Sequence, residues 1–459
     1  MPIKIPKPVH GQWSSAGIFV LAATGFAIGL KNIWQFPYHA GLYGGGAFIL
    51  VYVCFVFLLG VPLLMTQVML GRLGRQSPLG TLRHLVRRER VSRHWLIAGG
   101  LSVAVAFLIL SYFSAIAGWI LAYLMRAVFG GLQGQSADSA GALFSALIRD
   151  PEKQLFWYSL FIFLTMVVTA RGVRLGIELA VKFAVPVLLG LLVVLAVYAV
   201  SVGALNQSLN LFLAPDFTRL SGIGLLTALG DAFFSLGLGV GVMLLYGAYL
   251  PADAPIARVS VLVVAIDCIA GLLGGLIVFP VVLAAGPETQ SGVGLVFQSL
   301  VVGFDGLPGG GLMRALFFVM LVLVAWMSSI ALAELVVAWL VERFALARVR
   351  AAALTGVGAW LLGVATILSF NYWRFTFPVF GQIKTYGFFD LLQILTSSIM
   401  LPVIGLLLAL FGGWVLKPAT TREVLNLRSP CAYDAWLWLT RLAVPAWMLI
   451  VLVNMRLYL

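Results

Sequence analysis

The chain has 459 residues, of which 62% are hydrophobic and only 10% are charged, and its formal net charge is +13. This composition, with a mean hydropathy of +1.07, excludes a soluble domain and indicates a polytopic protein whose solvent is the lipid bilayer. The basic residues lie in short segments between apolar runs, where they report membrane orientation, so nucleic acid is excluded as a partner.

Apolar runs long enough to cross roughly 30 Å of hydrocarbon recur along the whole chain. We therefore predict eleven transmembrane helices, at 14–38, 45–71, 95–127, 155–171, 178–202, 223–249, 257–284, 311–343, 351–370, 387–414 and 434–456.

Basic residues gather in alternate loops, beginning with the loop between the second and third spans. By the positive-inside rule these loops are cytoplasmic, and so is the N-terminal segment 1–13. Because the span count is odd, we expect Leu459 to lie outside a multi-pass protein of the cell (inner) membrane. The loops at 128–154, 203–222 and 285–310 are then external.

The first span contains polar residues and glycines between Gly25 and Pro37, among them Lys31 and Asn32. Lipid offers no hydrogen bonds to loose backbone or ammonium groups, so these residues must face a protein-lined or wet cavity. A lone glycine in a span indicates helix packing, but this combination predicts a helix broken at a binding site.

The sixth span, five spans later, has a similar interruption at residues 230–241, with Gly237, Gly239 and Gly241 in its middle. Paired broken helices in corresponding halves are typical of inverted-repeat transporters with a site at the membrane midplane. There the half-helix ends point N–H groups at anions and carbonyl groups at cations. The alternative is a pair of glycine-rich packing helices.

Short motifs throughout the chain resemble the neurotransmitter:sodium symporter family. They include Trp13-Ser14-Ser15, Ala27-Ile28-Gly29-Leu30, Asn32-Ile33-Trp34, Phe36-Pro37-Tyr38, Gly44-Gly45-Gly46-Ala47-Phe48, Gly71-Arg72, Ala117-Gly118-Trp119, Gly176-Ile177-Glu178, Phe233-Phe234-Ser235, Phe279-Pro280, Ser328-Ser329 and Phe389-Asp390.

The resemblance implies an all-α polytopic membrane protein with a leucine-transporter-type 5+5 inverted repeat, in which spans 1 and 6 are unwound. The first five-span repeat is then 14–202, the extracellular loop 203–222 and the second repeat 223–414. A cytoplasmic loop and the eleventh span complete the chain at 415–459. The family works by alternating access driven by an ion gradient.

The resemblance also implies two sodium sites. The first matches the Ala27 carbonyl, Asn32, Ser235 and Asp267, whose oxygens suit a hard cation. The carboxylate of Asp267 supplies the charge that chloride provides in some relatives, so we expect no chloride; a structural hydrogen bond is the alternative role.

The second sodium site implied by the resemblance matches the carbonyls of Gly25 and Ile28 and the side chain of Ser328. We place Met327 at the position of a further oxygen ligand, and a thioether binds sodium poorly. Sodium is therefore expected to be weakened or lost there. A serine that bonds back to its own helix is the alternative role for Ser328.

The substrate site implied by the resemblance departs from the family pattern. Gly29 favours a carboxylate-bearing substrate, but Lys31 replaces a glycine, and Phe113 replaces a tyrosine, with Tyr112 one place earlier. The Lys31 ammonium pairs an anionic substrate, acts as a tethered cation against Asp267 or Asp231, or snorkels toward the external vestibule. The full predicted set is Gly29, Leu30, Lys31, Phe113, Phe234, Ser235, Gly237 and Gly239.

Both gates implied by the resemblance are altered. Gln35 and Gln393 stand where the family has an external arginine–aspartate pair, and Asp231 replaces a nearby glutamine. Losing both charges together avoids an unpaired buried ion. On the cytoplasmic side we predict a gate formed by His10, Trp13, Tyr249 and Glu342.

No enzyme signature competes with transport: the histidines are dispersed, and the glycines at 44–46 lack the lysine of a phosphate loop. We expect a secondary transporter that moves a small amino acid or related anionic solute with a cation, most simply Na+. The alternatives are a sodium-independent exchanger or proton-coupled carrier using Lys31 as a tethered cation, and a receptor that binds without transport. The sequence makes no prediction of oligomeric state or of the substrate side chain.

Overall fold

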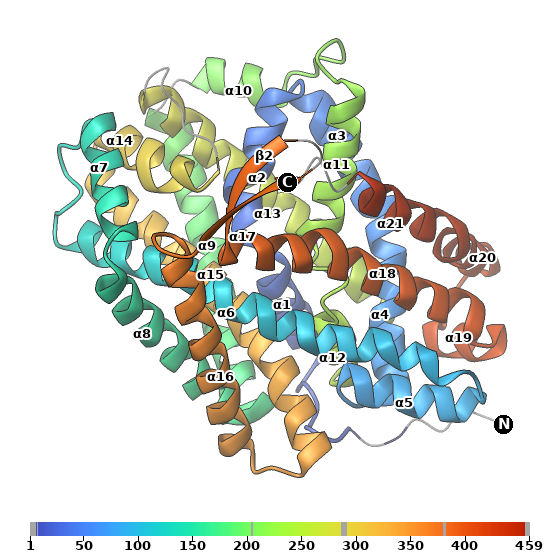
Figure 1. Cartoon of the computed structure of the whole chain (residues 1–459). Helices are drawn as coiled ribbons and strands as arrows, with labels where there is room; N and C mark the ends of the chain where they lie inside the picture. Colours follow the sequence, from blue (N-terminus) through green and yellow to red (C-terminus); the bar gives the residue numbers. More distant parts are fainter. Residues whose placement is uncertain (1–5, 7, 203–204, 286–291, 380–381, 455–459) are drawn as a thin grey trace.

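Long apolar helices dominate the architecture, which we describe from a computed structural model covering residues 6, 8–202, 205–285, 292–379 and 382–454 (Figure 1). Within these residues, nine helices are long and apolar enough to cross a membrane. Four of them are uninterrupted α-helices: α8 Pro151–Ala170, α13 Ile256–Ala285, α15 Gly310–Phe344 and α16 Arg348–Ser369.

The other five contain π-helical or 3-10 turns. Three of these are Gly46–Gly74 (α3 Gly46–Phe55, a π-helical turn Val56–Gly60 and α4 Val61–Gly74), Arg93–Val128 (a 3-10 turn Arg93–Trp95 and α6 Leu96–Val128) and Val173–Val202 (a π-helical turn Val173–Ile177 and α9 Glu178–Val202). The last two are Phe388–Val415 (α17 Phe388–Gln393, a π-helical turn Ile394–Met400, α18 Leu401–Leu410 and a π-helical turn Phe411–Val415) and Pro430–Val453 (α20 Pro430–Trp438, a π-helical turn Leu439–Ala443 and α21 Val444–Val453).

Two further spans are interrupted, at the places where the sequence predicts broken helices. The first is α1 (Ala16–Ala27) followed by α2 (Leu30–Leu42), with a bend of 57° between them. The second is α11 (Gly222–Ser235) followed by α12 (Val242–Ala248), with a non-helical connection between them. By length and composition, the nine helices and the first bent pair give up to ten spans in the described residues. The eleventh predicted span corresponds to α11 and α12, which are each shorter than a full span.

The connections carry short elements. An amphipathic helix, α5 (Pro78–Glu89), occupies the arginine-rich first loop, and α10 (Leu205–Leu213) lies in the predicted extracellular loop 203–222, whose first two residues are outside the described part. An antiparallel hairpin of β1 (Arg374–Val379) and β2 (Gln382–Gly387), which was not predicted from the sequence, follows α16. The remaining elements are α7 Ala137–Ile148, a π-helical turn Leu295–Ser299, α14 Leu300–Asp305 and α19 Pro418–Leu425.

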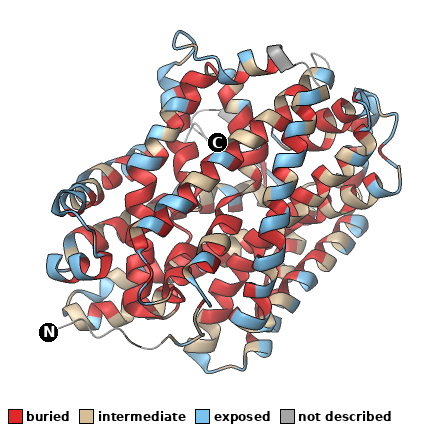
Figure 2. Ribbon diagram, turned by 180° about the vertical axis from the view of Figure 1, so that it is seen from behind, coloured by how far each residue is buried: buried red, intermediate tan, exposed pale blue. Residues whose placement is uncertain are grey.

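Buried residues fill the centre of the bundle, and exposed residues lie on its outer surface (Figure 2). α13 packs against α1, α2 and α9, while the long α15 packs against α6, so the broken helices are enclosed by continuous ones. Large apolar side chains such as Phe163, Phe183 and Val357 are exposed on the outer helices. In a membrane these outer faces contact acyl chains, and the polar residues of the broken spans remain inside.

Candidate functional site

The first helix break lies at Ile28 and Gly29, which adopt extended conformations between α1 and α2. The Ile28 N–H still bonds to the Thr24 carbonyl at 2.9 Å, so α1 ends abruptly rather than unwinding slowly. The last carbonyls of α1 and the first N–H groups of α2 have no partners within their own helices. The break therefore presents free backbone carbonyls and N–H groups to the interior.

The second break depends on glycines in the left-handed region between α11 and α12. Gly237, Gly239 and Gly241 have φ values of +59°, +94° and +92°. A Cβ on Gly237 would lie 2.5 Å from the ring of Phe26 in α1. The two helix breaks are therefore packed directly against each other, as a shared site requires.

Gly239→Ala is expected to destabilise this junction severely. The added Cβ would lie 2.3 Å from the Leu401 carbonyl oxygen, and the left-handed backbone costs a further ~1–2 kcal/mol. We expect loss of the folded, monodisperse protein on size-exclusion chromatography. Gly222→Ala is the control, since a Cβ there meets nothing within 4 Å; equal behaviour of the two variants would contradict this account.

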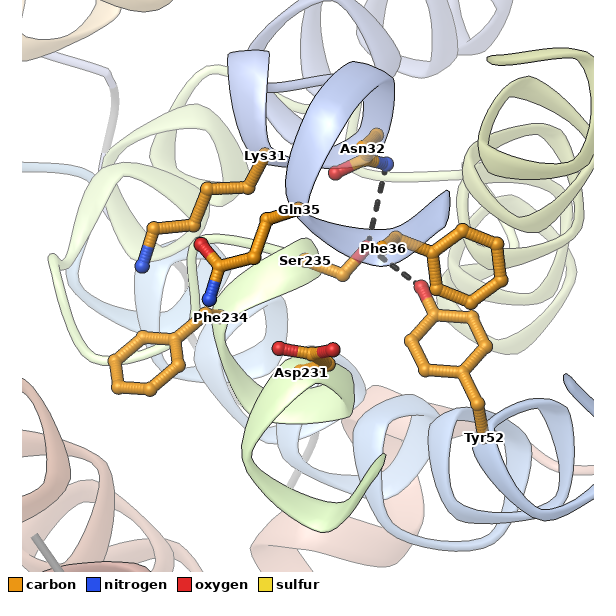
Figure 3. A pocket seen from close by; sticks show the side chains of 8 residues that line it. All are labelled: Lys31, Asn32, Gln35, Phe36, Tyr52, Asp231, Phe234 and Ser235. Atoms are coloured by element: carbon orange, nitrogen blue, oxygen red, sulfur yellow. Dashed lines mark hydrogen bonds between the residues drawn. The ribbon is translucent and has the colours of Figure 1, made fainter. Parts of the chain in front are cut away.

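A polar cluster joins the two breaks to α13 and the second span, and Figure 3 shows its members Asn32, Ser235 and Tyr52. The Asn32 amide donates to Asp267 at 2.7 Å and to the Ser235 hydroxyl at 3.3 Å, and Ser235 itself donates to Asp267. The Tyr52 hydroxyl donates to Ser235 at 2.8 Å. The structure thus brings together the three side chains predicted for the first sodium site, and it adds Tyr52 to them.

Asp267 is fully buried, yet within the described part of the chain its carboxylate oxygens accept hydrogen bonds only from the neutral Asn32 and Ser235. In the described residues no cationic side chain pairs with it. A buried carboxylate without a counter-charge is costly. Its environment fits a hard monovalent cation, which would supply that charge.

The region predicted for the second sodium site has a different set of neighbours. The Ser328 hydroxyl donates to the Val324 carbonyl at 3.1 Å, which is the back-bonded arrangement. Met327 packs against Gly25, with its Cγ 3.5 Å from the position of a Cβ there. The buried hydroxyl of Ser329, however, has no hydrogen-bond partner in the described residues. Ser329 is thus an available oxygen in this region that the sequence analysis overlooked.

A small cavity lies beside the polar cluster and below a larger vestibule. The cavity has a volume of about 10 Å³, room for about one water molecule, and Lys31, Gln35, Asp231 and Phe234 are in its wall. The vestibule has a volume of about 610 Å³ and also reaches Lys31, Gln35 and Phe234. These shared wall residues form the boundary between the two spaces.

Lys31 places its ammonium group 4.4 Å from the centre of the Phe234 ring. Among the described residues it forms no ion pair with a carboxylate, since Asp231 pairs with His39 and Asp267 bonds to Asn32 and Ser235. Figure 3 shows its side chain extending past Gln35 toward Phe234. This arrangement presents the positive charge to the vestibule floor.

Several residues predicted for substrate binding do not line either space as the structure describes it. Leu30 and Phe113 pack in an apolar cluster, and Gly239 packs on the backbone of Leu401. Tyr112 bonds to the Thr396 hydroxyl at 3.1 Å. Of the residues predicted to bind substrate, Lys31, Phe234 and Ser235 are among the described wall residues of the two spaces. Gly29 and Gly237 are not among these wall residues and instead allow the backbone conformation at the two helix breaks.

The residues predicted for the external gate all lie around the vestibule or the cavity beneath it. Gln35 and Gln393 both line the vestibule. Asp231 instead pairs with His39, at 2.6 Å between Oδ2 and Nδ1. No role was predicted for His39 from the sequence. It follows Pro37 by two residues and Gln35 by one helical turn, so it lies on the same helix face as the predicted gate residue Gln35, and this spacing was a usable signal.

The residues predicted for the cytoplasmic gate form a connected set. His10 lies 2.8 Å from Glu342, and Glu342 also accepts hydrogen bonds from the backbone N–H, at 2.7 Å, and the hydroxyl of Ser77. The Trp13 N–H donates to the Tyr249 carbonyl at 2.9 Å, and their rings meet edge to face. These contacts hold the N-terminal segment across the end of the bundle.

Glu342→Gln is expected to loosen this N-terminal segment. The amide keeps the shape of the carboxylate but weakens the charge-assisted bonds to His10 and Ser77, each worth about 1.5–3 kcal/mol. Amide hydrogen exchange of residues 11–19 should therefore become faster. Glu152→Gln, on the exposed first turn of α8, is the control. Exchange at the wild-type rate would argue against a latch at Glu342.

Comparison with known proteins agrees with this geometry. A sequence profile described as the Sodium:neurotransmitter symporter family matches residues 10–139 and 151–453. The chain is 34% identical over 456 residues to an uncharacterized sodium-dependent transporter, YhdH, of Bacillus subtilis, with 98% of each chain covered. It is 28% identical to an uncharacterized sodium-dependent transporter of Haemophilus influenzae, with 96% of this chain and 97% of that protein covered.

A solved structure gives the same result in three dimensions. The crystal structure of MhsT in complex with L-phenylalanine superposes with a TM-score of 0.85 at 35% sequence identity, covering 97% of this chain and 99% of that one. The helical architecture with interrupted spans 1 and 6 is thereby confirmed. The chain belongs to the sodium:neurotransmitter symporter family and is a multi-pass, sodium-coupled secondary transporter.

Proposed function

We propose that this transporter carries a small amino acid or a related solute with an anionic end, together with sodium, by alternating access. The observation that carries the proposal is the buried Asp267 carboxylate, which has hydrogen-bond donors but no described counter-charge. Asn32, Ser235 and the Ala27 carbonyl complete an oxygen-rich environment for Na+. The L-phenylalanine bound to MhsT supports an amino acid as the substrate class.

For sodium at the second position, the hydroxyl of Ser329 is added to the oxygens that the family resemblance implies. We assign to this position the carbonyls of Gly25 and Ile28 and the hydroxyls of Ser328 and Ser329. The two serines are consecutive residues of α15, and the buried Ser329 hydroxyl, which has no hydrogen-bond partner in the described residues, supports a ligand role. Met327 then serves as packing against Gly25.

The anionic end of the substrate is assigned to Lys31. Its ammonium lies over Phe234 at the vestibule floor and is not paired with a described carboxylate. A carboxylate placed there would gain a charge-assisted hydrogen bond. This position supports pairing with a substrate more than a tethered charge against Asp267 or Asp231, since Asp231 pairs with His39. A tethered charge is the arrangement that a sodium-independent exchanger or proton-coupled carrier requires.

The proposed topology follows the basic loops. Residues 1–13 are cytoplasmic, 14–202 and 223–414 form the inverted repeats, and 415–459 continue through an eleventh span to an external C-terminus in the inner membrane. The large vestibule at the ends of α2 and α11 is then external, and the His10–Glu342 contact closes the cytoplasmic side. The described arrangement corresponds to an outward-facing state.

A ligand panel tests the substrate assignment. Purified protein in sodium buffer is titrated with amino acids, their amides, taurine-like sulfonates and amine-free carboxylates, and thermal stabilisation is measured. Free amino acids should stabilise the protein, whereas amides, which lack the anionic end, should not. Equal stabilisation by acids and amides would contradict a role for Lys31 in anion recognition.

Chloride is not expected to contribute to transport. Asp267 already supplies a fixed negative charge beside the first cation site, so a mobile anion has no electrostatic role there. Replacing chloride with gluconate at constant sodium should leave the initial rate of uptake unchanged. A marked fall in that rate would show that the carboxylate does not replace chloride.

A further inference from the structure

An apolar groove opens on the outside of the bundle, and its wall residues differ from those of the vestibule and the small cavity. It lies between α6, α15 and α16, with Leu79 at the start of α5 closing one end. Its volume of about 420 Å³ falls within the roughly 300–1,000 Å³ of small-molecule sites. Phe107, Trp339 and Leu354 contribute large apolar walls.

The groove faces the lipid phase. Leu354, Val357 and Leu361 on the neighbouring face of α16 are 56%, 58% and 60% exposed, so this surface meets acyl chains in a membrane. A Cβ added to Gly100, in the wall of the groove, would have no neighbour within 4 Å. The hollow is therefore open at the position where a side chain would normally fill it.

Arginines extend two of its walls toward the membrane surface. Arg343 follows Trp339 by four residues on α15, and Arg350 precedes Leu354 by four residues on α16, so each lies one turn from a wall residue on the same helix face. Both are exposed, and neither forms an ion pair with a described carboxylate. The α15–α16 connection that joins them lies at the same end of the bundle as α5, in a loop predicted to be cytoplasmic (Figure 1).

We propose that this groove binds one acyl chain of an anionic phospholipid from the cytoplasmic leaflet, with the phosphate held by Arg343 and Arg350. The apolar walls match a hydrocarbon chain, and the two unpaired guanidinium groups match a phosphate in charge and geometry. Such a site favours an anionic phospholipid over the other lipids of the bilayer, because only the anionic headgroup gains the arginine contacts. The site is independent of the substrate and sodium assignments.

Photo-crosslinking tests this proposal on the full-length protein. The protein is reconstituted in phosphatidylcholine vesicles containing a small fraction of either phosphatidylglycerol or phosphatidylcholine with a diazirine in the acyl chain, and the labelled peptides are mapped by mass spectrometry. Phosphatidylglycerol should label residues 100–107 and 354–358 preferentially. The Arg343→Gln/Arg350→Gln variant should lower that labelling by about fivefold for each arginine.

Two further variants make the result decisive. Gly100→Leu places a side chain in the open space and should abolish labelling of 354–358 by either lipid, while the protein keeps its melting temperature. Arg258→Gln, an exposed arginine on α13, should change nothing. Equal labelling by both lipids, or labelling that survives the arginine and glycine substitutions, would identify ordinary bilayer contact and overturn the proposal.

Discussion

Asp267→Asn is expected to abolish sodium-dependent uptake in a protein that still folds. Asparagine has nearly the shape of aspartate and keeps one acceptor oxygen, so one of the two hydrogen bonds donated by Asn32 and Ser235 is retained while the fixed charge is removed. Removing one partner of a buried ion pair costs about 3–5 kcal/mol, so sodium affinity should fall by more than about a hundredfold. Binding of radiolabelled sodium to the purified variant measures this change directly.

Cys268→Ser is the matched control for this experiment. Cys268 is the next residue on α13 and is also buried, but its substitution leaves the Asp267 carboxylate intact. Sodium affinity should therefore stay close to that of the wild type. If Asp267→Asn also bound sodium normally, the carboxylate would have only its structural role as a hydrogen-bond acceptor.

Lys31→Met is expected to weaken the binding of substrate without changing the binding of sodium. Methionine fills a similar volume beside Phe234 but cannot pair with an anion. The loss should be about 1.5–3 kcal/mol, the range for a hydrogen bond to a charged group, and hence at least about tenfold in affinity. Isothermal titration of substrate at saturating sodium gives the value.

Two companion variants separate the roles considered for Lys31. Lys31→Arg keeps the positive charge and should retain a larger share of substrate affinity than Lys31→Met. Lys31→Gly should leave the ion dependence of uptake unchanged if the ammonium pairs with substrate. If uptake is sodium-independent in the wild type and becomes sodium-dependent in Lys31→Gly, the lysine is a tethered cation and the substrate assignment is wrong.

Most of the fold could be predicted from local patterns. Each span is an apolar run with a length set by the bilayer, and the breaks are marked by glycines such as Gly29 and Gly239 within those runs. The hairpin at Arg374–Gly387 was not predicted, because its two strands of six residues are far too short to span a membrane. The alternating apolar residues Phe375, Phe377 and Val379 are typical of a strand, and this local pattern was left unused.

The site could be predicted only in part, because its pairings join helices that are distant in sequence. Asn32, Ser235 and Asp267 were predicted through the family resemblance, and they do meet. The contact between His39 and Asp231 spans 192 residues and has no local pattern. Ser329 was missed because the ligand position was placed on Met327, and side-chain direction on a helix depends on exact register.

Uptake into proteoliposomes tests the central claim most directly. Protein of known orientation is loaded into sodium-free vesicles, and accumulation of a radiolabelled amino acid is measured with an inward sodium gradient, without it, and after an ionophore collapses it. The account predicts accumulation above the external concentration only while the gradient persists. Counterflow that is independent of sodium, or binding without any flux, would contradict sodium-coupled transport by this chain.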